Sequence, residues 1–72
     1  MEGRLLHKGT VKRWLNGRGY GFIGVDGRET DVFVYNSDVE GRPSLSVGER
    51  VELDIKETDK GPKAVNVVVV TE

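Results

Sequence analysis

The sequence predicts an all-β fold, a closed or nearly closed barrel of five short antiparallel strands. Apolar residues recur with a period of two rather than 3.6, which is the spacing of strands and not of helices. Glycine, asparagine and aspartate interrupt the alternation every six to fifteen residues, and the 72 residues contain no long helical pattern. Closure is expected because it removes the sheet edges that a small β-protein would otherwise expose.

The first three strands are expected at residues 5–15, 20–25 and 31–35. The sequence Asn16-Gly17-Arg18-Gly19 separates the first two and supplies glycines that allow positive φ. Asp26-Gly27-Arg28 follows the second strand. It predicts a tight hairpin, because Asp-Gly is favoured where both central residues of the turn need positive φ.

Residues 36–48 form the longest irregular segment, in which Ser37 and Glu40 have the spacing of a capping box and predict one helical turn. The fourth strand is expected at residues 49–56, where apolar and acidic residues alternate. Residues that face inward are Val51, Leu53 and Ile55, and those that face outward are Glu52 and Asp54. A turn at residues 58–62 leads to the fifth strand at 64–70, whose run of valines leaves its register open.

Length and composition limit the chain to one domain over residues 1–72, with residues 1–7 either extending the first strand or forming a short tail. Cysteine is absent and His7 is the single histidine, so neither a disulfide nor a zinc site is expected, and no metal or cofactor is predicted. No apolar run approaches the ~20 residues of a membrane span. A soluble, cytoplasmic monomer without a small-molecule substrate is therefore expected.

The net charge of −1 argues against the broad basic surface of a duplex-DNA binder, but the charge is segregated along the chain. Residues 1–25 hold five basic side chains against one acidic, whereas residues 26–59 hold four against ten. This pattern fits either a basic functional surface or an ordinary solvated one.

All five aromatic residues fall within 22 positions on the first three strands, at Trp14, Tyr20, Phe22, Phe33 and Tyr35. In the second and third strands the aromatic rings alternate with aliphatic residues, so one set faces the core and the other faces outward. An aliphatic interior of Val11, Ile23, Val25, Val32, Val34, Val51, Leu53 and Ile55 leaves the rings exposed. The reverse assignment, with four buried rings, is the more usual place for aromatic residues and stays open at this point.

Two further features favour exposed rings. Gly19 and Gly21 flank Tyr20, and glycine in a strand often marks a place where a ligand or another backbone approaches closely. Lys12 and Trp14 have the same strand parity, opposite to Val11, and are expected together on the outer face. Exposed rings interleaved with cations suit single-stranded nucleic acid, because bases stack on rings and phosphates bind the cations.

Catalysis has no support in the sequence. Residues 19–24 fit the dinucleotide-binding pattern G-x-G-x-x-G, but here the pattern lies within a strand instead of opening a helix. Ten of the twelve carboxylates are spread over turns and outward strand positions between Asp26 and Asp59, with no base or nucleophile grouped among them. The chain is therefore not expected to be an enzyme.

Several motifs in order resemble the cold-shock domain family, from about Lys8 to Val70: Gly9-Thr10-Val11-Lys12, Arg18-Gly19-Tyr20-Gly21-Phe22-Ile23, Asp31-Val32-Phe33-Val34-Tyr35 and residues 60–67. The resemblance implies a five-stranded barrel of the OB type that binds single-stranded RNA or DNA and often acts as an RNA chaperone. By position, it implies nucleic-acid contacts from Lys12, Trp14, Arg18, Tyr20, Phe22, Phe33, Tyr35 and Lys60.

The chain departs from the family pattern at two rings. Where the family usually has Trp-Phe after the lysine, this chain has Arg13 and Trp14, and where it usually has His-Phe, this chain has Tyr35 and Asn36. Weaker stacking is expected, with partial compensation by the plane and charge of Arg13. The hypothesis is a binder of single-stranded RNA or DNA, and the alternative is an OB-type module that docks a protein on the same aromatic surface.

Overall fold

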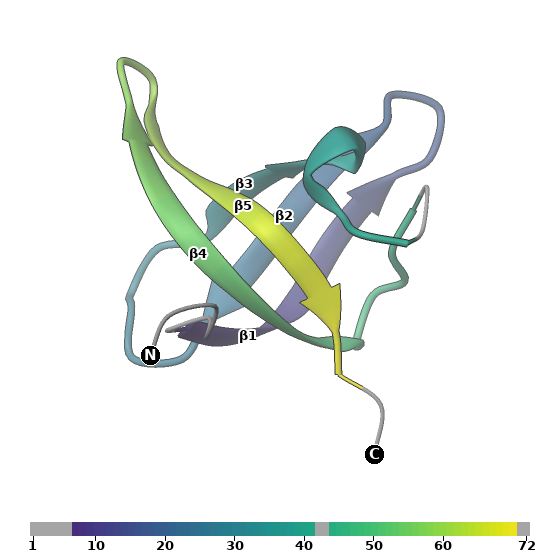
Figure 1. The fold of residues 1–72 in the computed structure, drawn as a ribbon, viewed down its shortest axis with the longest axis horizontal. Helices are drawn as coiled ribbons and strands as arrows, with labels where there is room; N and C mark the ends of the chain where they lie inside the picture. Colours follow the sequence, from purple (N-terminus) through teal and green to yellow (C-terminus); the bar gives the residue numbers. More distant parts are fainter. Residues whose placement is uncertain (1–6, 42–43, 71–72) are drawn as a thin grey trace.

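The computed structural model describes residues 7–41 and 44–70, which form a closed barrel with the strand order β1-β2-β3-β5-β4 (Figure 1). The elements are β1 (His7–Leu15), β2 (Tyr20–Val25), β3 (Val32–Tyr35), the 3-10 turn η1 (Asn36–Asp38), β4 (Arg50–Thr58) and β5 (Gly61–Val69). The predicted five-stranded barrel of the OB type is confirmed. Residues 5 and 6, predicted to belong to the first strand, lie outside the described residues.

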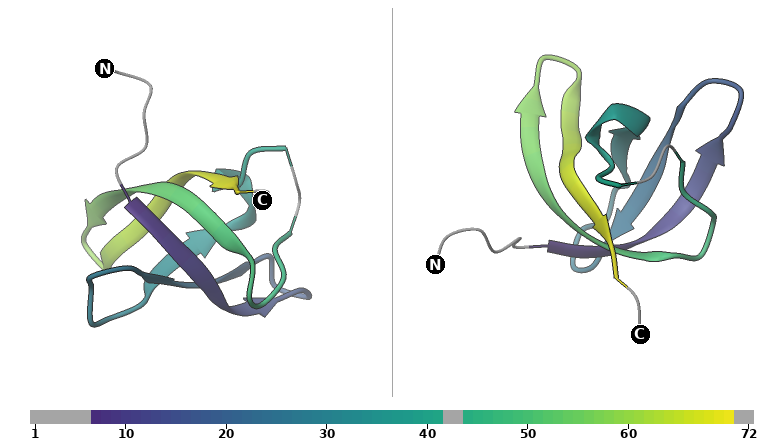
Figure 2. Two further views of the ribbon diagram at one scale, coloured as in Figure 1. Left: turned by 90° about the horizontal axis from the view of Figure 1, so that it is seen from below. Right: turned by 45° about the vertical axis from the view of Figure 1, so that its right-hand side comes forward.

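One strand pair differs from the antiparallel arrangement that the sequence predicted. β3 and β5 are parallel, with Phe33 beside Lys63 and Val34 beside Ala64, while the other four neighbouring pairs are antiparallel. The reason is geometric, because a closed ring of five strands cannot alternate in direction throughout. The chain crosses one end of the barrel through η1 before β4 begins, so that β5 returns in the direction of β3 (Figures 1 and 2).

The barrel interior is aliphatic, and this confirms which face of β2 and β3 points inward. The buried residues are Val11, Ile23, Val25, Val32, Val34, Val39, Leu45, Val51, Leu53, Ala64 and Val67, with Trp14, Ile55 and Val69 partly buried against them. At about 0.8 kcal/mol for each buried CH₂ group, this small cluster provides the main stabilisation of the fold.

Two β-bulges change the direction in which side chains point. In β1 the register with β2 shifts between Val11 and Arg13, so that residues after the bulge have the opposite parity. The register between β4 and β5 shifts between the pairs Glu52–Val68 and Asp54–Val65, so that β5 has one extra residue there. Asn66, in this bulge, has a positive φ of 53°. This second bulge settles the register that the valine run left open, because it buries both Ala64 and Val67.

Two local predictions are corrected. The Asp26-Gly27 turn is not a two-residue hairpin with two positive φ values: Gly27 has a φ of 85°, Asp26 does not, and residues 26–31 all lie between β2 and β3. The predicted helical turn exists, but it begins at Asn36, after Tyr35, and has no side-chain cap. Ser37 lies inside the turn, so the predicted capping box does not form.

The long β4–β5 hairpin extends beyond the rest of the barrel (Figures 1 and 2). Both strands have nine residues and pair as far as Thr58 and Gly61, further than the sequence predicted. No helix in residues 7–41 and 44–70 is long and apolar enough to cross a membrane.

Candidate nucleic-acid interface

Four aromatic rings form one continuous outer surface on β2 and β3, which we call the aromatic face: Tyr20, Phe22, Phe33 and Tyr35. The strand register creates it, because Tyr20 pairs with Tyr35 and Phe22 pairs with Phe33. Residues paired directly across two strands point to the same side of the sheet. The alternating residues of both strands are in the core, so the rings must lie outside it.

The rings of the aromatic face pack mostly edge to face, with Tyr20 and Phe33 tilted at 37°, and leave parts of their surfaces open to solvent. Phe33 is central, with ring centroids 5.0 Å from Tyr20, 5.5 Å from Phe22 and 4.6 Å from Tyr35. These separations lie in the favourable range for aromatic pairs. Tyr35 is the most open of the four rings, with 43% of its surface exposed. The rings therefore hold one another in place while remaining available to a planar ligand.

The bulge in β1 decides which side chains border the aromatic face. Arg13 pairs with Phe22 and is exposed, so its side chain lies on the same side of the sheet as the Phe22 ring. Lys12 also lies on the outer face, because a Cβ atom built on Gly24 would meet its side chain at 2.6 Å. The structure thus brings Lys12 and Arg13 to the edge of the aromatic face.

Trp14 does not lie where the sequence predicted. The backbone of Trp14 pairs with that of Gly21 on β2. Its side chain does not lie beside that of Lys12 but packs, partly buried, against the core. The indole Nε1 is buried without a hydrogen-bond partner in the described part of the chain. The expected outward position of Trp14 is therefore wrong, because the bulge reverses the parity on which that expectation depended.

A groove of about 450 Å³ runs from the aromatic face to the β4–β5 turn. Its lining residues are Phe22, Asp31, Phe33, Tyr35, Thr58, Lys60, Gly61, Pro62 and Lys63. Lys60 thus lies in the same groove as three of the rings. Lys63 also lines the groove and was not among the predicted site residues. The parallel pairing of β3 with β5 sets Lys63 next to Phe33, and no local signal predicts that neighbour.

Arg18 lies further away, in the exposed turn between β1 and β2. The amides of Arg18 and Gly19 both donate to the Leu15 carbonyl oxygen at 2.9 Å, and the Asn36 amide donates to the Gly19 carbonyl oxygen at 2.9 Å. The turn is therefore fixed to the end of β3, near Tyr20 and Tyr35. Arg18 does not line the groove, so its part in the site stays a prediction.

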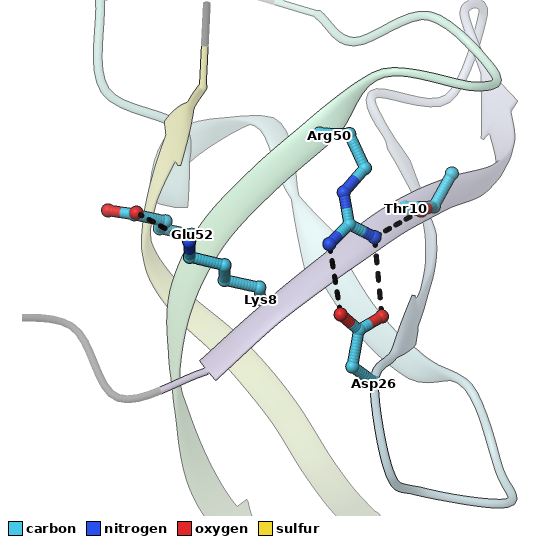
Figure 3. Close-up of polar contacts among 5 residues, drawn as sticks. All are labelled: Lys8, Thr10, Asp26, Arg50 and Glu52. Atoms are coloured by element: carbon cyan, nitrogen blue, oxygen red, sulfur yellow. Dashed lines mark hydrogen bonds and ion pairs between the residues drawn. The ribbon is translucent and has the colours of Figure 1, made fainter.

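An ion pair between Arg50 and Asp26 fixes the loop that leads into β3 (Figure 3). Arg50 on β4 donates to both carboxylate oxygens of Asp26, at 3.2 and 2.9 Å, and to the Thr10 hydroxyl at 2.8 Å. The hydrogen bond from Arg50 is the main cause that lowers the pKa of Asp26; desolvation opposes it, and the charges of Arg50 and Lys8 act in the same direction as the hydrogen bond. This contact joins β1, β4 and residues 26–31, and that loop carries the groove residue Asp31.

No group of three or more His, Cys, Asp or Glu side chains within residues 7–41 and 44–70 could hold a metal ion. The arrangement that the structure does provide is a set of open rings bordered by Lys12 and Arg13 on one side and by Lys60 and Lys63 on the other.

Comparison with known proteins agrees with this arrangement. The family model described as the "Cold-shock" DNA-binding domain matches residues 7–70. The chain is 50% identical over 66 residues to "Cold shock protein CspA" of Staphylococcus saprophyticus, covering 88% of this chain and 97% of that protein. It is 45% identical over 67 residues to "Cold shock-like protein" of Aquifex aeolicus, covering 90% and 96%.

A solved structure, drosophila Unr CSD456, has a similar fold, with a TM-score of 0.76 at 18% identity. The match covers 90% of this chain and 26% of that longer one. The family model spans nearly all the described residues, and the similarity to the two bacterial proteins extends over almost their entire lengths. The chain belongs to the cold-shock domain family, a family of nucleic-acid-binding domains.

Proposed function

We propose that this protein binds single-stranded RNA or DNA by stacking bases on the aromatic face, while cations at its borders contact phosphates. The observation that carries the proposal is the register of β2 and β3, which gathers four partly open rings into one surface. Each base offers a flat face to a ring, and stacking contributes about 1–3 kcal/mol per base. Three or four stacked bases are consistent with micromolar affinity, about −8 kcal/mol, after association costs.

Single strands suit this surface better than a duplex does. Bases in a duplex are stacked on one another, so their faces are not available to side chains. We further propose that the protein melts weak RNA secondary structure by capturing bases that open transiently. In this proposal it acts as a cytoplasmic monomer, without metal or cofactor, and catalyses no reaction.

Salt dependence separates phosphate contacts from stacking. Lys12, Arg13, Arg18 and Lys60 are proposed to steer the backbone, and neutralising two to four phosphates gives a slope of log K against log salt of about −1.4 to −2.8. The test is fluorescence anisotropy of labelled oligo-dT and oligo-rU over a salt series, with the annealed duplex as competitor. Tight, salt-insensitive binding, or equal competition by the duplex, would contradict the proposal.

Ring variants test the stacking itself. Phe22→Ala should lower affinity about 5- to 150-fold, as expected for the loss of one stacked base. Val68→Ala is a matched control, because Val68 is an exposed apolar residue that pairs with Glu52 on the β4 side of the barrel. If the wild-type protein binds no oligonucleotide, the aromatic face is better explained as a protein-docking surface.

Opening of a quenched RNA hairpin by excess protein tests the chaperone activity. Phe22→Ala should slow or abolish the opening, and Val68→Ala should not. Binding without opening would limit the function to binding.

A further inference from the structure

Lys63 occupies a defined position at the Tyr35 end of the aromatic face. Its Nζ atom lies 5.3 Å from the centroid of the Tyr35 ring, within the distance of a cation–π contact. The same atom lies 3.4 Å from Oδ2 of Asp38 in η1. Since the ring and the carboxylate both hold the ammonium group, less side-chain freedom is lost when Lys63 binds a third partner.

The Asp38 carboxylate lies largely beneath Lys63. Its Oδ2 atom is buried and has no hydrogen-bond partner in the described residues, so the ion pair is the interaction that compensates it. The side chains of Asp38 and Lys63 are only 23% and 31% exposed. An ammonium group has three donor hydrogens, and the ring and the carboxylate engage two sides of it. Lys63 also lines the groove, so a remaining donor hydrogen can reach a ligand bound there.

We propose that Lys63, held over Tyr35 by Asp38, is a specificity-determining residue that donates a hydrogen bond to a carbonyl oxygen of a base bound at this end of the aromatic face. The proposal rests on the proposed function and assigns a contact within it. A base is favoured over a phosphate as the acceptor because the charges of the Lys63–Asp38 pair cancel. A phosphate at Lys63 would also be repelled by the neighbouring carboxylate, whereas a carbonyl oxygen carries only a partial charge.

The expected consequence is discrimination between bases. Thymine, uracil, cytosine and guanine have an exocyclic carbonyl oxygen, and adenine has none. Removing Lys63 alone leaves the Asp38 carboxylate uncompensated, so the preference between bases, and not the salt slope, is the readout for Lys63. Lys60 provides the contrast, because it lines the same groove and makes no ion pair with another residue in the described ranges.

The experiment compares Lys63→Met with the matched control Lys60→Met, using labelled oligo-dT and oligo-dA over a salt series. Lys63→Met should weaken oligo-dT binding about tenfold, the scale of one hydrogen bond from a charged donor, with a much smaller change for oligo-dA. Lys60→Met should weaken both oligonucleotides to a similar degree and make the slope shallower by about 0.7.

Asp38→Asn tests the role of the carboxylate. Removing it leaves Lys63 as an uncompensated cation, so the slope should become steeper by about 0.7 and the preference for oligo-dT over oligo-dA should fall. Trp14 fluorescence in urea verifies that each variant is folded, since Trp14 packs against the core.

Two results would overturn the inference. If Lys63→Met weakens both oligonucleotides equally, Lys63 is an ordinary phosphate contact. If it changes neither affinity, the pair with Asp38 serves the fold alone, for example by relieving repulsion from Lys56, which pairs with Lys63 across β4 and β5. Both results require a wild-type protein that binds oligo-dT, so they differ from a failure of the proposed function, in which the wild type binds neither oligonucleotide.

Discussion

Truncating Phe33 and truncating its neighbour Val34 should have opposite effects on binding and folding, because the two side chains lie on opposite faces of β3. Phe33 contacts the other three rings of the aromatic face and lines the groove. Val34 is fully buried, with 0% of its surface exposed. The pair therefore tests the central structural premise of the function, that the rings face outward and the aliphatic residues inward.

The magnitudes follow from these positions. Phe33→Ala removes a stacking surface, which should lower affinity by about 1–3 kcal/mol, or about 5- to 150-fold. Val34→Ala removes two buried methyl groups at about 0.8 kcal/mol each and leaves a cavity, for a total destabilisation of about 2–3 kcal/mol. Domains of this length have a total stability of about 4–11 kcal/mol, so that loss is a large fraction of the whole.

Urea unfolding followed by Trp14 fluorescence measures stability, and anisotropy of labelled oligo-dT measures affinity. A second variant, Phe33→Leu, keeps apolar packing but removes the flat ring, so affinity should fall while the unfolding midpoint stays close to that of the wild type. Val34→Ala should lower the midpoint strongly and leave the affinity of the folded protein nearly unchanged. If Phe33→Leu unfolds more readily than Val34→Ala, or binds as tightly as the wild type, the assignment of the rings to stacking is wrong.

Two further predictions concern the framework around the aromatic face. The pKa of Asp26 is lowered below its ordinary value of 3.8 in the folded state. Its ion pair with Arg50 therefore stabilises the protein above the unfolded pKa, and this stabilisation is lost as pH falls through the folded pKa. Urea midpoints measured across acidic pH should fall more steeply for the wild type than for Arg50→Gln. Gly21→Ala should destabilise the fold strongly because the new Cβ would meet β1 backbone atoms. Gly24→Ala should be tolerated because the nearest atoms to its new Cβ belong to the flexible side chain of Lys12. Comparing the thermal unfolding midpoints of the two variants tests this difference.

The parts of the fold that follow from local alternation could be predicted from the sequence. β2 was predicted at its observed bounds, and the inward position of residues such as Ile23 and Val34 follows from a period of two. The parallel β3–β5 pair could not be read in this way, because it depends on how the whole ring of strands closes. Lys63 was missed as a site residue for the same reason, since it borders Phe33 only through that pairing.

The bulge in β1 limited the prediction of the site most directly. Residues 11–14 contain neither glycine nor proline, and nothing in their sequence indicates that the alternation is interrupted there. At Asn66 the sequence did contain a signal, because asparagine tolerates positive φ better than most residues. The valines around Asn66, however, predict an uninterrupted strand. Local patterns thus predict faces within a strand reliably until a bulge, imposed by barrel closure, shifts the register.

The same bulge changes what the replacement of an aromatic residue by Arg13 means for binding. Strict alternation would have placed Trp14 outside and Arg13 in the opposite direction, but the observed register sets Arg13 beside Phe22 and turns Trp14 toward the core. A planar guanidinium group therefore stands where the family resemblance implies a ring. Since arginine can stack on a base and also carries a charge, we propose that Arg13 extends the aromatic face toward β1 and combines both modes of contact. Rising salt screens the charge of Arg13 but not stacking on its guanidinium plane. The contribution of Arg13 to binding should therefore persist in part at salt concentrations that remove simple phosphate contacts.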